Sequence, residues 1–501
     1  MLLSECAPLL GKGPASPLRQ IKSRSRGSGT LATMMVDTPL PIATDVLRRF
    51  DVPGPRYTSY PTADRFVEAF GPVQLVQALQ QRAGGVGAAG GRAAPLSLYV
   101  HVPFCESVCY YCACNKIITR HHERAAEYLD ALEREVELYV GVLGREQPVS
   151  QLHLGGGTPT FLSDDELARL MGSLRRAFRL VPGGEYSIEV DPRTVSAERL
   201  SVLAGLGFNR ISLGVQDFDP EVQKAVHRIQ SFDSVAGLIE QARKLGIESV
   251  NADLIYGLPR QTPVSFARTL DLISQLRPDR IALYGYAHLP ARFKPQRRIH
   301  AEELPSAADK LAMLSGAITR FASAGYDYIG MDHFALHTDA LAVAKRQGRL
   351  HRNFQGYSTQ PDSDLIALGV SAIGRIGSTY SQNAKTLPEY YDALRQGQFP
   401  VVRGLALSRD DLVRRAVIMA LMCQGHVSFE SIELSYLIDF RQYFAAELGQ
   451  LQAMAEQGLV RIETDGLSVS PAGWYVVRGI AMVFDKYLQA ERSRERFSRI
   501  I

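Results

Sequence analysis

The sequence predicts an α/β fold: a partial (β/α)6 barrel, preceded by an N-terminal arm and followed by a mostly helical C-terminal domain. Three observations support this prediction. Short apolar segments alternate with amphipathic helical patterns over residues 96–340, the apolar segments are rich in β-branched residues, and glycine or polar residues follow each of them. Buried strands that alternate with helices are typical of parallel sheets.

The first 36 residues differ in composition from the rest of the chain. They carry five basic residues and one acid, which leaves 51 basic and 51 acidic residues elsewhere. Because they are rich in Gly, Ser, Pro and Ala, we expect a disordered basic extension. A targeting segment is the alternative, but we favour a dispensable extension, or a start at Met34 or Met35. Residues 37–95 are expected to form an arm that covers the active site.

Residues 96–340 contain the six predicted strands, and the helical patterns lie between them. Residues 124–143 repeat apolar side chains near the spacing of a one-sided helix, and residues 265–276 form a second such pattern. Six units are fewer than the eight of a complete TIM barrel. The predicted strands are 98–102, 151–155, 186–190, 210–215, 250–256 and 280–286.

Polar or glycine-rich segments follow these strands. A cysteine loop follows the first strand and "GGGTPT" (155–160) follows the second, while Glu189 ends the third and Asp253 lies within the fifth. The carboxyl ends of barrel strands meet at one face, which is where such barrels carry their active sites. The pattern therefore predicts one composite site.

The strand–helix alternation stops near residue 340. Residues 341–501 are expected to be mostly helical, with a hairpin over 459–470 that contains an Asp-Gly turn signal. Helices followed by a small hairpin also occur in winged-helix DNA-binding domains. However, no Lys or Arg lies between Arg441 and Arg461, and the body of the chain is neutral, so we expect no nucleic-acid partner.

No apolar run approaches the roughly 18–20 residues that span a bilayer, so no membrane partner is expected. Six cysteines in 501 residues are too few for a disulfide scaffold. The clustered thiols predict a reducing compartment, and we expect a cytoplasmic location and a monomer.

Four of the six cysteines lie in "HVPFCESVCYYCACNK" (101–116): Cys105, Cys109, Cys112 and Cys114. A disulfide pair, a lone catalytic thiol, a zinc site and an iron–sulfur cluster are the candidates. Zinc sites commonly use two separated Cys pairs, whereas all four thiols here share one loop. Three thiolates on a four-iron cluster leave one iron open for another ligand, so C-x3-C-x2-C favours the cluster.

This motif after the first barrel strand resembles the radical S-adenosylmethionine (SAM) superfamily. The resemblance implies that Cys105, Cys109 and Cys112 bind a [4Fe–4S] cluster. It also implies that the amino and carboxylate groups of SAM chelate the fourth iron, and that reductive cleavage of SAM yields a 5′-deoxyadenosyl radical.

Further motifs, in chain order, resemble the oxygen-independent coproporphyrinogen III oxidases from about residue 37 to the C-terminus. They are "RYTSYPTA" (56–63), "CACNKIITR" (112–120), "LHLGGGTPT" (152–160), "IEVDPR" (188–193), "NRISLGVQDF" (209–218), "DLIYGLPRQTP" (253–263), "YAHLP" (286–290), "GMDHFA" (330–335), "HRNFQGYSTQ" (351–360) and "GVSAIG" (369–374).

The resemblance implies an oxidoreductase of haem biosynthesis. Two propionates of coproporphyrinogen III would be oxidatively decarboxylated to vinyl groups, giving protoporphyrinogen IX, with two SAM molecules in the site. An electron donor such as flavodoxin or ferredoxin and an unidentified electron acceptor are also implied.

The resemblance also assigns cofactor-binding residues by position. The first SAM would be held by Tyr99, Gly156, Glu189 and Ile373. The second would be held by Tyr111, Gly157, Thr158, Gln216, Arg228, Asp253 and Ala287. Glycine lets the backbone approach a ligand closely, and strand-end carboxylates accept hydrogen bonds from hydroxyl or ammonium groups. Taken singly, such an acid is more often a helix cap or a surface ion pair.

Cys114 is expected not to be a ligand of the cluster. The related haem-chaperone branch typically has phenylalanine there and lacks the "RYTSYPTA" arm, so Cys114 and the arm favour the oxidase. A haem chaperone and a zinc-stabilised binding barrel remain the alternatives. His333 and Tyr357 are candidates to face the substrate, or are structural groups. Arginine and lysine side chains are expected to meet its carboxylates.

Overall fold

The computed structural model describes residues 44–88, 94–490 and 499. The predicted basic extension, 1–36, lies outside the described residues. The described residues belong to one compact unit, so the boundaries predicted at 96 and 341 stay predictions.

A large mixed sheet carries the site. Its parallel part contains the six predicted strands: β1 (Leu96–Val102), β4 (Gln147–Gly156), β5 (Phe178–Val190), β6 (Arg210–Gln216), β7 (Ser249–Tyr256) and β8 (Arg280–Gly285). They pair side by side in chain order. All six strands are confirmed; β4 and β5 begin earlier than predicted, at Gln147 instead of residue 151 and at Phe178 instead of residue 186, and the other ends differ by one or two residues.

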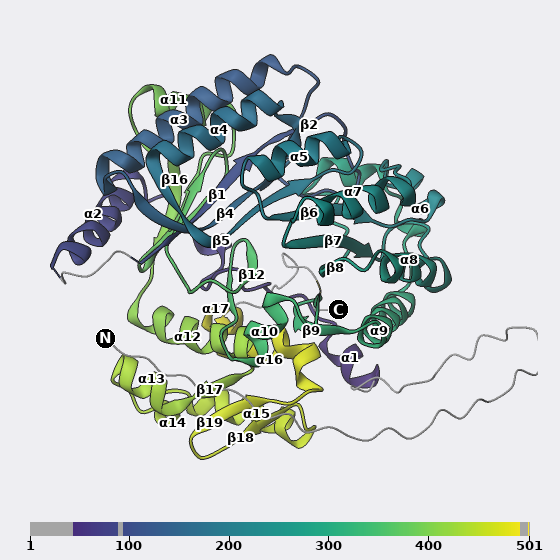
Figure 1. Ribbon diagram of the computed structural model, residues 1–501. Helices are drawn as coiled ribbons and strands as arrows, with labels where there is room; N and C mark the ends of the chain where they lie inside the picture. The colour runs from purple at the N-terminus through teal and green to yellow at the C-terminus, as the bar shows by residue number, and fades with distance from the viewer. Residues whose placement is uncertain (1–43, 89–93, 491–498, 500–501) are drawn as a thin grey trace, which may run out of the picture. The chain divides into compact units, whose positions relative to one another are not determined.

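Helices follow these strands in the expected alternation and pack outside the curved sheet (Figure 1). The predicted helices 124–143 and 265–276 are confirmed as α3 and α8. Capping boxes begin several helices, for example Ser163 with Glu166 at α4 and Thr262 with Ser265 at α8. The helices between and after the strands are α3 (Glu123–Leu143), α4 (Asp164–Ala177), α5 (Ala197–Gly205), α6 (Pro220–Ala225), α7 (Phe232–Lys244), α8 (Pro263–Leu276) and α9 (Ala307–Ser323).

The sheet continues beyond the predicted strands at both edges. Past β8 lie β10 (His333–Leu336) and β9 (Tyr326–Gly330). Past β1 lie β13 (Leu365–Leu368), which is parallel to β1, and then β14 (Ile373–Ile376), β15 (Thr379–Asn383) and β16 (Val401–Ala406), which are antiparallel. The described sheet thus has 12 strands and two open edges, which makes the barrel partial.

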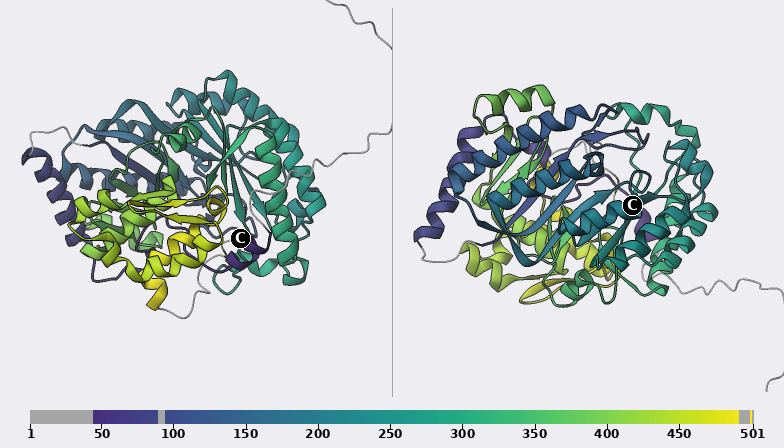
Figure 2. Two further views of the ribbon diagram at one scale, coloured as in Figure 1. Left: turned by 90° about the horizontal axis from the view of Figure 1, so that it is seen from below. Right: turned by 45° about the horizontal axis from the view of Figure 1, so that its top comes forward.

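Part of the region that was expected to be mostly helical therefore belongs to the sheet. The helical C-terminal region begins with α12 (Arg409–Gln424), and its hairpin is β18 (Val460–Ile462) and β19 (Gly466–Val469), as predicted. It also contains β17 (His426–Ser428), α13 (Phe429–Tyr436), α14 (Phe440–Tyr443), α15 (Ala445–Glu456), α16 (Val477–Ala481) and α17 (Lys486–Ala490). Figure 2 displays this yellow-green region from two further directions.

Two short stretches connect the barrel to the C-terminal helices. The arm contains α1 (Thr44–Phe50) and α2 (Pro72–Ala88), and between them Tyr57 donates a hydrogen bond to Asp485 at 3.0 Å. The second stretch contains α10 (Ala340–Arg346) and the strand pair β11 (His351–Asn353) and β12 (Gly356–Ser358). Tyr357 of β12 donates to the Met422 carbonyl at 2.9 Å. Within the described residues, no helix is long and apolar enough to cross a membrane.

Candidate active site

The cysteine loop leaves the carboxyl end of β1 and is closed at its base by a short parallel pair, β2 (Phe104–Cys105) and β3 (Ile117–Ile118). Cys105 and Cys109 are buried, Cys112 is half-buried and Cys114 is exposed. All four line a single cavity of about 280 Å³. The thiols thus surround a space at the face that the strand-end pattern predicted.

The glycine-rich loop after β4 holds the cysteine loop in place. The Gly157 amide donates to the Val102 carbonyl and the Thr158 amide donates to the Phe104 carbonyl, each at 2.8 Å. The Thr158 hydroxyl also donates to the Cys105 sulfur at 3.3 Å. A methyl group on Gly157 would lie 2.7 Å from the Phe104 carbonyl oxygen, so only glycine allows this approach.

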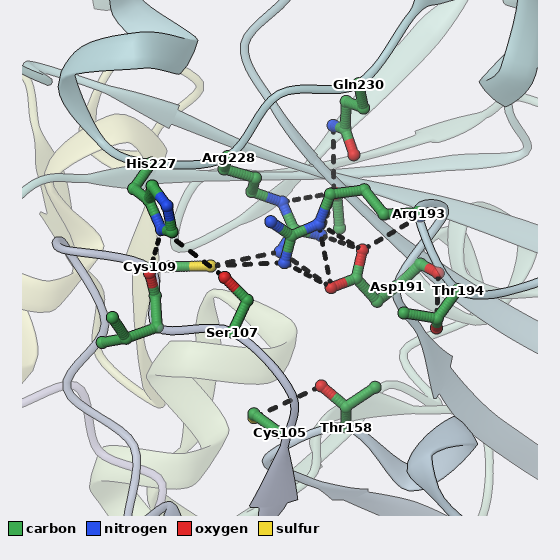
Figure 3. Close-up of polar contacts among 12 residues, drawn as sticks. Cys105, Ser107, Cys109, Thr158, Asp191, Arg193, Thr194, His227, Arg228 and Gln230 are labelled. Carbon is green, nitrogen blue, oxygen red and sulfur yellow. Dashed lines mark hydrogen bonds and ion pairs between the residues drawn. The ribbon is translucent and has the colours of Figure 1, made fainter. Parts of the chain in front are cut away.

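Two arginines and one carboxylate lie beside Cys109 (Figure 3). Arg228 donates to the Cys109 sulfur at 3.4 Å and to the Asp191 carboxylate at 3.2 and 3.3 Å. Arg193 pairs with the same carboxylate at 2.6 Å and reaches the sulfur at 3.7 Å. Burial alone would raise the pKa of Asp191, but its hydrogen bond from Arg193 and the charge of Arg228 lower it. Two guanidinium groups thus lie within hydrogen-bonding distance of the Cys109 sulfur.

Lys116 and Cys114 lie beside the third cysteine of the motif. A hydrogen bond from the Cys114 thiol lowers the pKa of Cys112, and the nearby Lys116 ammonium lowers it further. Lys116 also donates to the Cys112 carbonyl at 2.9 Å. Cys114 therefore contacts a predicted ligand while its own side chain is exposed.

Glu189 lies at the end of β5 and accepts a hydrogen bond from the Gly156 amide at 3.0 Å. His153 lies 3.4 Å from the same carboxylate. Burial would raise the pKa of Glu189, but the hydrogen bond and charge of His153, together with the Gly156 amide, lower it. Gly156 has a φ of +115°, a conformation that glycine adopts readily.

Asp253 projects from β7 and accepts hydrogen bonds from the Ser212 hydroxyl at 2.9 Å and the Asn251 amide at 2.8 Å. Burial and then the charge of Glu189 raise the pKa of Asp253 to about 6, although these two hydrogen bonds oppose the shift. The two acids thus differ: Glu189 is held ionised, and Asp253 titrates near neutral pH.

We expect Asp253→Asn to stabilise the cofactor-free protein at pH 8. A carboxyl whose folded-state pKa is raised contributes stability below its unfolded pKa of about 3.9, and that contribution is lost as pH rises through 6. The substitution removes this loss and should add about 2 kcal/mol at pH 8 and less at pH 5. Urea unfolding at both pH values measures the gain. A gain that is equal or larger at pH 5 would contradict the assignment.

Three adjoining cavities contain the predicted site residues. Besides the cysteine cavity, one of about 370 Å³ and one of about 190 Å³ lie at the same face. Glu189 and Tyr284 border all three. The 280 Å³ cavity is lined by Cys105, Cys109, Cys112, Tyr111, Gly156, Gly157, Thr158, Glu189, Gln216, Arg228 and Asp253, and the 370 Å³ cavity by Tyr99, Glu189 and Ile373.

Ala287 is the predicted residue that lines neither of these cavities. It borders a separate cavity of about 700 Å³ beneath α1 and α9. One side chain connects it to the cysteine loop, because the Gln296 amide donates to the Ala287 carbonyl at 3.2 Å and to the Tyr111 carbonyl at 3.0 Å.

The structure adds site residues that the sequence did not single out. His153, Asp191 and Arg193 contact predicted residues directly, while Tyr284 and Arg352 line the cavities. Asp191 and Arg193 stand in the motif "IEVDPR", so a strand-end acid two residues after Glu189 was the available signal. Arg352 stands in the motif "HRNFQGYSTQ" (351–360), but nothing in that motif marked the arginine as a site residue.

Comparison with known proteins first gives the class. The sequence pattern of the radical SAM superfamily matches residues 99–273, which span the cysteine loop and strands β4 to β7, and the pattern of the HemN C-terminal domain matches residues 407–476. The fold and the cysteine loop thus define a radical SAM protein, whose cofactors are a [4Fe–4S] cluster and SAM.

Whole-chain similarity then gives the family. The oxygen-independent coproporphyrinogen III oxidase of Pseudomonas aeruginosa is 51% identical over 461 residues, covering 91% of this chain and 98% of that protein. The enzyme of Escherichia coli K12 is 46% identical over 456 residues, with the same coverage. A solved structure of coproporphyrinogen III oxidase (HemN) from Escherichia coli superposes with a TM-score of 0.83, at 46% identity, over 89% of this chain and 99% of that one. The chain belongs to the family of oxygen-independent coproporphyrinogen III oxidases.

The residues at the site fit these cofactors. Thiols are soft ligands suited to iron–sulfur clusters, and they border a cavity rather than being joined in disulfides. Arg193, Arg228 and Thr158 offer hydrogen bonds to their sulfurs, which tune such clusters. Glycine at 156 and 157 lets this loop pack against the His101 ring and against the backbone of Pro103 and Phe104, where any larger residue would clash, and so keeps it beside the cysteine cavity that both glycines line.

Proposed function

We propose that the protein catalyses the oxidative decarboxylation of two propionates of coproporphyrinogen III to vinyl groups, giving protoporphyrinogen IX. The observation that carries the proposal is the cysteine-lined cavity, with its glycine loop and strand-end acids, in a chain that matches the oxidases over 91% of its length. Porphyrin and haem biosynthesis is the corresponding metabolic role. A haem chaperone without decarboxylase activity is less favoured, because Cys114 and the arm are present.

Cys105, Cys109 and Cys112 are proposed as the ligands of the cluster. Their shared cavity, and the hydrogen-bond donors around Cys105 and Cys109, support this assignment. Cys114, which is exposed and contacts Cys112, is proposed to be a neighbour of the cluster rather than a ligand.

Two SAM sites are proposed on the two sides of Glu189. Tyr99, Gly156, Glu189 and Ile373 would hold the first molecule, and Tyr111, Gly157, Thr158, Gln216, Arg228, Asp253 and Ala287 the second. Glu189 is the best acceptor for a hydroxyl or ammonium group, because its lowered pKa keeps it ionised. Gln216 supports the second site through its left-handed backbone (φ of +68°), a strained conformation that is common at ligand sites. Arg228 already pairs with Asp191, so its role there would be to position Cys109 as well.

When bound and reduced, the cofactors that these residues would hold would supply radical chemistry: removal of a hydrogen atom from a propionate β-carbon, with loss of CO2 and of one electron to an acceptor. The residues of the chain orient the reactants and limit the access of water. Half-buried aromatic and polar side chains around the cavities, such as Tyr284 and His333, serve that purpose. An unidentified acceptor takes the electron.

The electron donor, the oligomeric state and the compartment of the protein are also proposed. An electron donor such as flavodoxin or ferredoxin would reduce the cluster, and the enzyme would act as a monomer. A reducing compartment such as the cytoplasm is proposed because the described cysteines near the site are free thiols.

Anaerobic turnover tests the function. We expect the protein reconstituted with iron and sulfide, reduced and given SAM with coproporphyrinogen III, to form 5′-deoxyadenosine and protoporphyrinogen IX. An intact cluster without either product would reject the oxidase. Haem binding without decarboxylation would favour the chaperone, and stoichiometric zinc in place of a cluster would favour a zinc-stabilised barrel.

A further inference from the structure

Arg352 of β11 is a buried cation without a matching anion. Its residue is 6% exposed, and its Nε and Nη1 atoms are buried and have no hydrogen-bond partner. Among the residues that the structure describes, no acidic side chain forms an ion pair with it. Its guanidinium stacks over the Tyr357 ring at 4.6 Å, which orients the group but leaves those donors unused. Burying unpaired donors of a charged group is costly, so such a group is typical of a ligand site.

Arg352 lines the 370 Å³ cavity together with residues proposed to hold SAM. Tyr99, Glu189 and Ile373 line the same cavity, whose volume is within the range of small-molecule sites. Arg352 therefore has access to a ligand that lies next to the cofactor.

The charges around this cavity leave a place for one anion. Arg56 of the arm also lines it and already has a partner, since its guanidinium lies 3.5 Å from the Asp332 carboxylate. Burial, and then the charge of Arg352, lower the pKa of His333 to about 3, so this imidazole is neutral. Glu189 is an acid that lines this cavity, and its carboxylate is already bonded to His153 and the Gly156 amide. Arg352 is the positive charge left unbalanced among these groups.

We propose that Arg352 binds a carboxylate of the substrate, one propionate of the porphyrinogen, and so determines how the substrate is positioned beside the SAM molecule. The proposal rests on the proposed function and names a residue of its substrate site. A guanidinium offers parallel N–H donors that match the two oxygens of a carboxylate. Arg56, stacked on Tyr284 at 5.0 Å and paired with Asp332, lines the same cavity.

SAM also carries a carboxylate, but that group has another place to bind. In the proposed arrangement it would bind the open iron, and the cysteines line the 280 Å³ cavity and not the one that Arg352 borders. The carboxylate that Arg352 fits is therefore a propionate of the substrate. Separate measurements of SAM binding and of porphyrin binding distinguish the two carboxylates.

The first experiment measures binding without turnover. The reconstituted full-length protein with SAM is titrated with coproporphyrin III, a stable fluorescent relative of the substrate. We expect Arg352→Gln to weaken coproporphyrin binding by roughly 30-fold or more. Arg352→Lys keeps the positive charge but loses the parallel pair of N–H donors, so it should weaken binding less. SAM binding should not change. The control Arg169→Gln removes a surface arginine paired with Glu133 and should change neither affinity.

Chemical rescue and stability separate a ligand role from a structural one. Ethylguanidinium should restore coproporphyrin binding to Arg352→Ala. Arg352→Met should leave the thermal midpoint of the cofactor-free protein unchanged or raised, because it removes an unpaired buried charge. Arg414→Met should lower that midpoint, because Arg414 pairs with Asp410 and Glu447.

The outcomes distinguish this inference from the proposed function. Unchanged coproporphyrin affinity in Arg352→Gln, or no coproporphyrin binding by the unaltered protein, overturns the inference even where protoporphyrinogen is formed. A fall in SAM affinity alone assigns Arg352 to the cofactor and also overturns it. A loss of stability in Arg352→Met as large as in Arg414→Met would show that Arg352 has a structural role, and would overturn the inference. Arg352-dependent binding without product formation would reject the oxidase and retain the carboxylate site.

Discussion

Serine at position 105, 109 or 112 is expected to abolish assembly of the iron–sulfur cluster, whereas Cys114→Ser is expected to leave it largely intact. Three thiolates hold the cluster in this proposal, and a serine hydroxyl is a poor replacement for a soft thiolate ligand. Cys114 lines the same cavity but differs in being exposed and in hydrogen-bonding to Cys112. Iron and acid-labile sulfide per protein, with the electron paramagnetic resonance signal after reduction, measure the outcome.

The four variants are their own matched set, because each makes the same change within one ten-residue loop. Circular dichroism and the thermal midpoint of the cofactor-free proteins establish that each variant is folded. A full cluster in Cys109→Ser would show that Cys109 is not a ligand of the cluster. Loss of the cluster from folded Cys114→Ser would make Cys114 a ligand and return the site to a four-cysteine arrangement.

The repeated strand–helix units made the parallel part of the sheet predictable. Each unit carries its own signal: an apolar strand such as 250–256, then an amphipathic helix such as 265–276. Strands β13 to β16 lacked that signal. They are four to six residues long, and β13 pairs with β1, more than 260 residues earlier in the chain. A pairing between such distant segments leaves no periodicity in the sequence.

The candidate site was predictable where the position of a residue at a strand end decides the face of the sheet at which it lies. Glu189 and the glycine loop end their strands, and the carboxyl ends of parallel strands meet at one face, so their convergence followed from the fold class. The pairing of Asp191 with Arg228 did not follow, because it depends on how a side chain from the segment after α6 returns to β6. Arg352 is a similar case: its missing partner is visible only when every nearby acid has been placed.

The contact between the glycine loop and the cysteine loop gives the second large expected effect. Gly157→Ala should lower the stability of the protein by about 1–3 kcal/mol or more and reduce its cluster content. The added methyl group would lie 2.7 Å from the backbone of Pro103 and Phe104, and backbone cannot move aside as a flexible side chain can. Relief would require β2 to shift, and Cys105 would move with it.

Gly237→Ala is the matched control, since it makes the same chemical change where the structure leaves space. Gly237 lies inside α7, and an added methyl group there meets no atom within 4 Å. Alanine has the higher helix propensity, so this variant should be stabilised by about 0.5–1 kcal/mol and keep its cluster. Urea unfolding and iron content, measured on both variants, test the difference in sign. Equal behaviour of the two would mean that the cysteine loop does not depend on the close approach at Gly157, and that another contact positions Cys105.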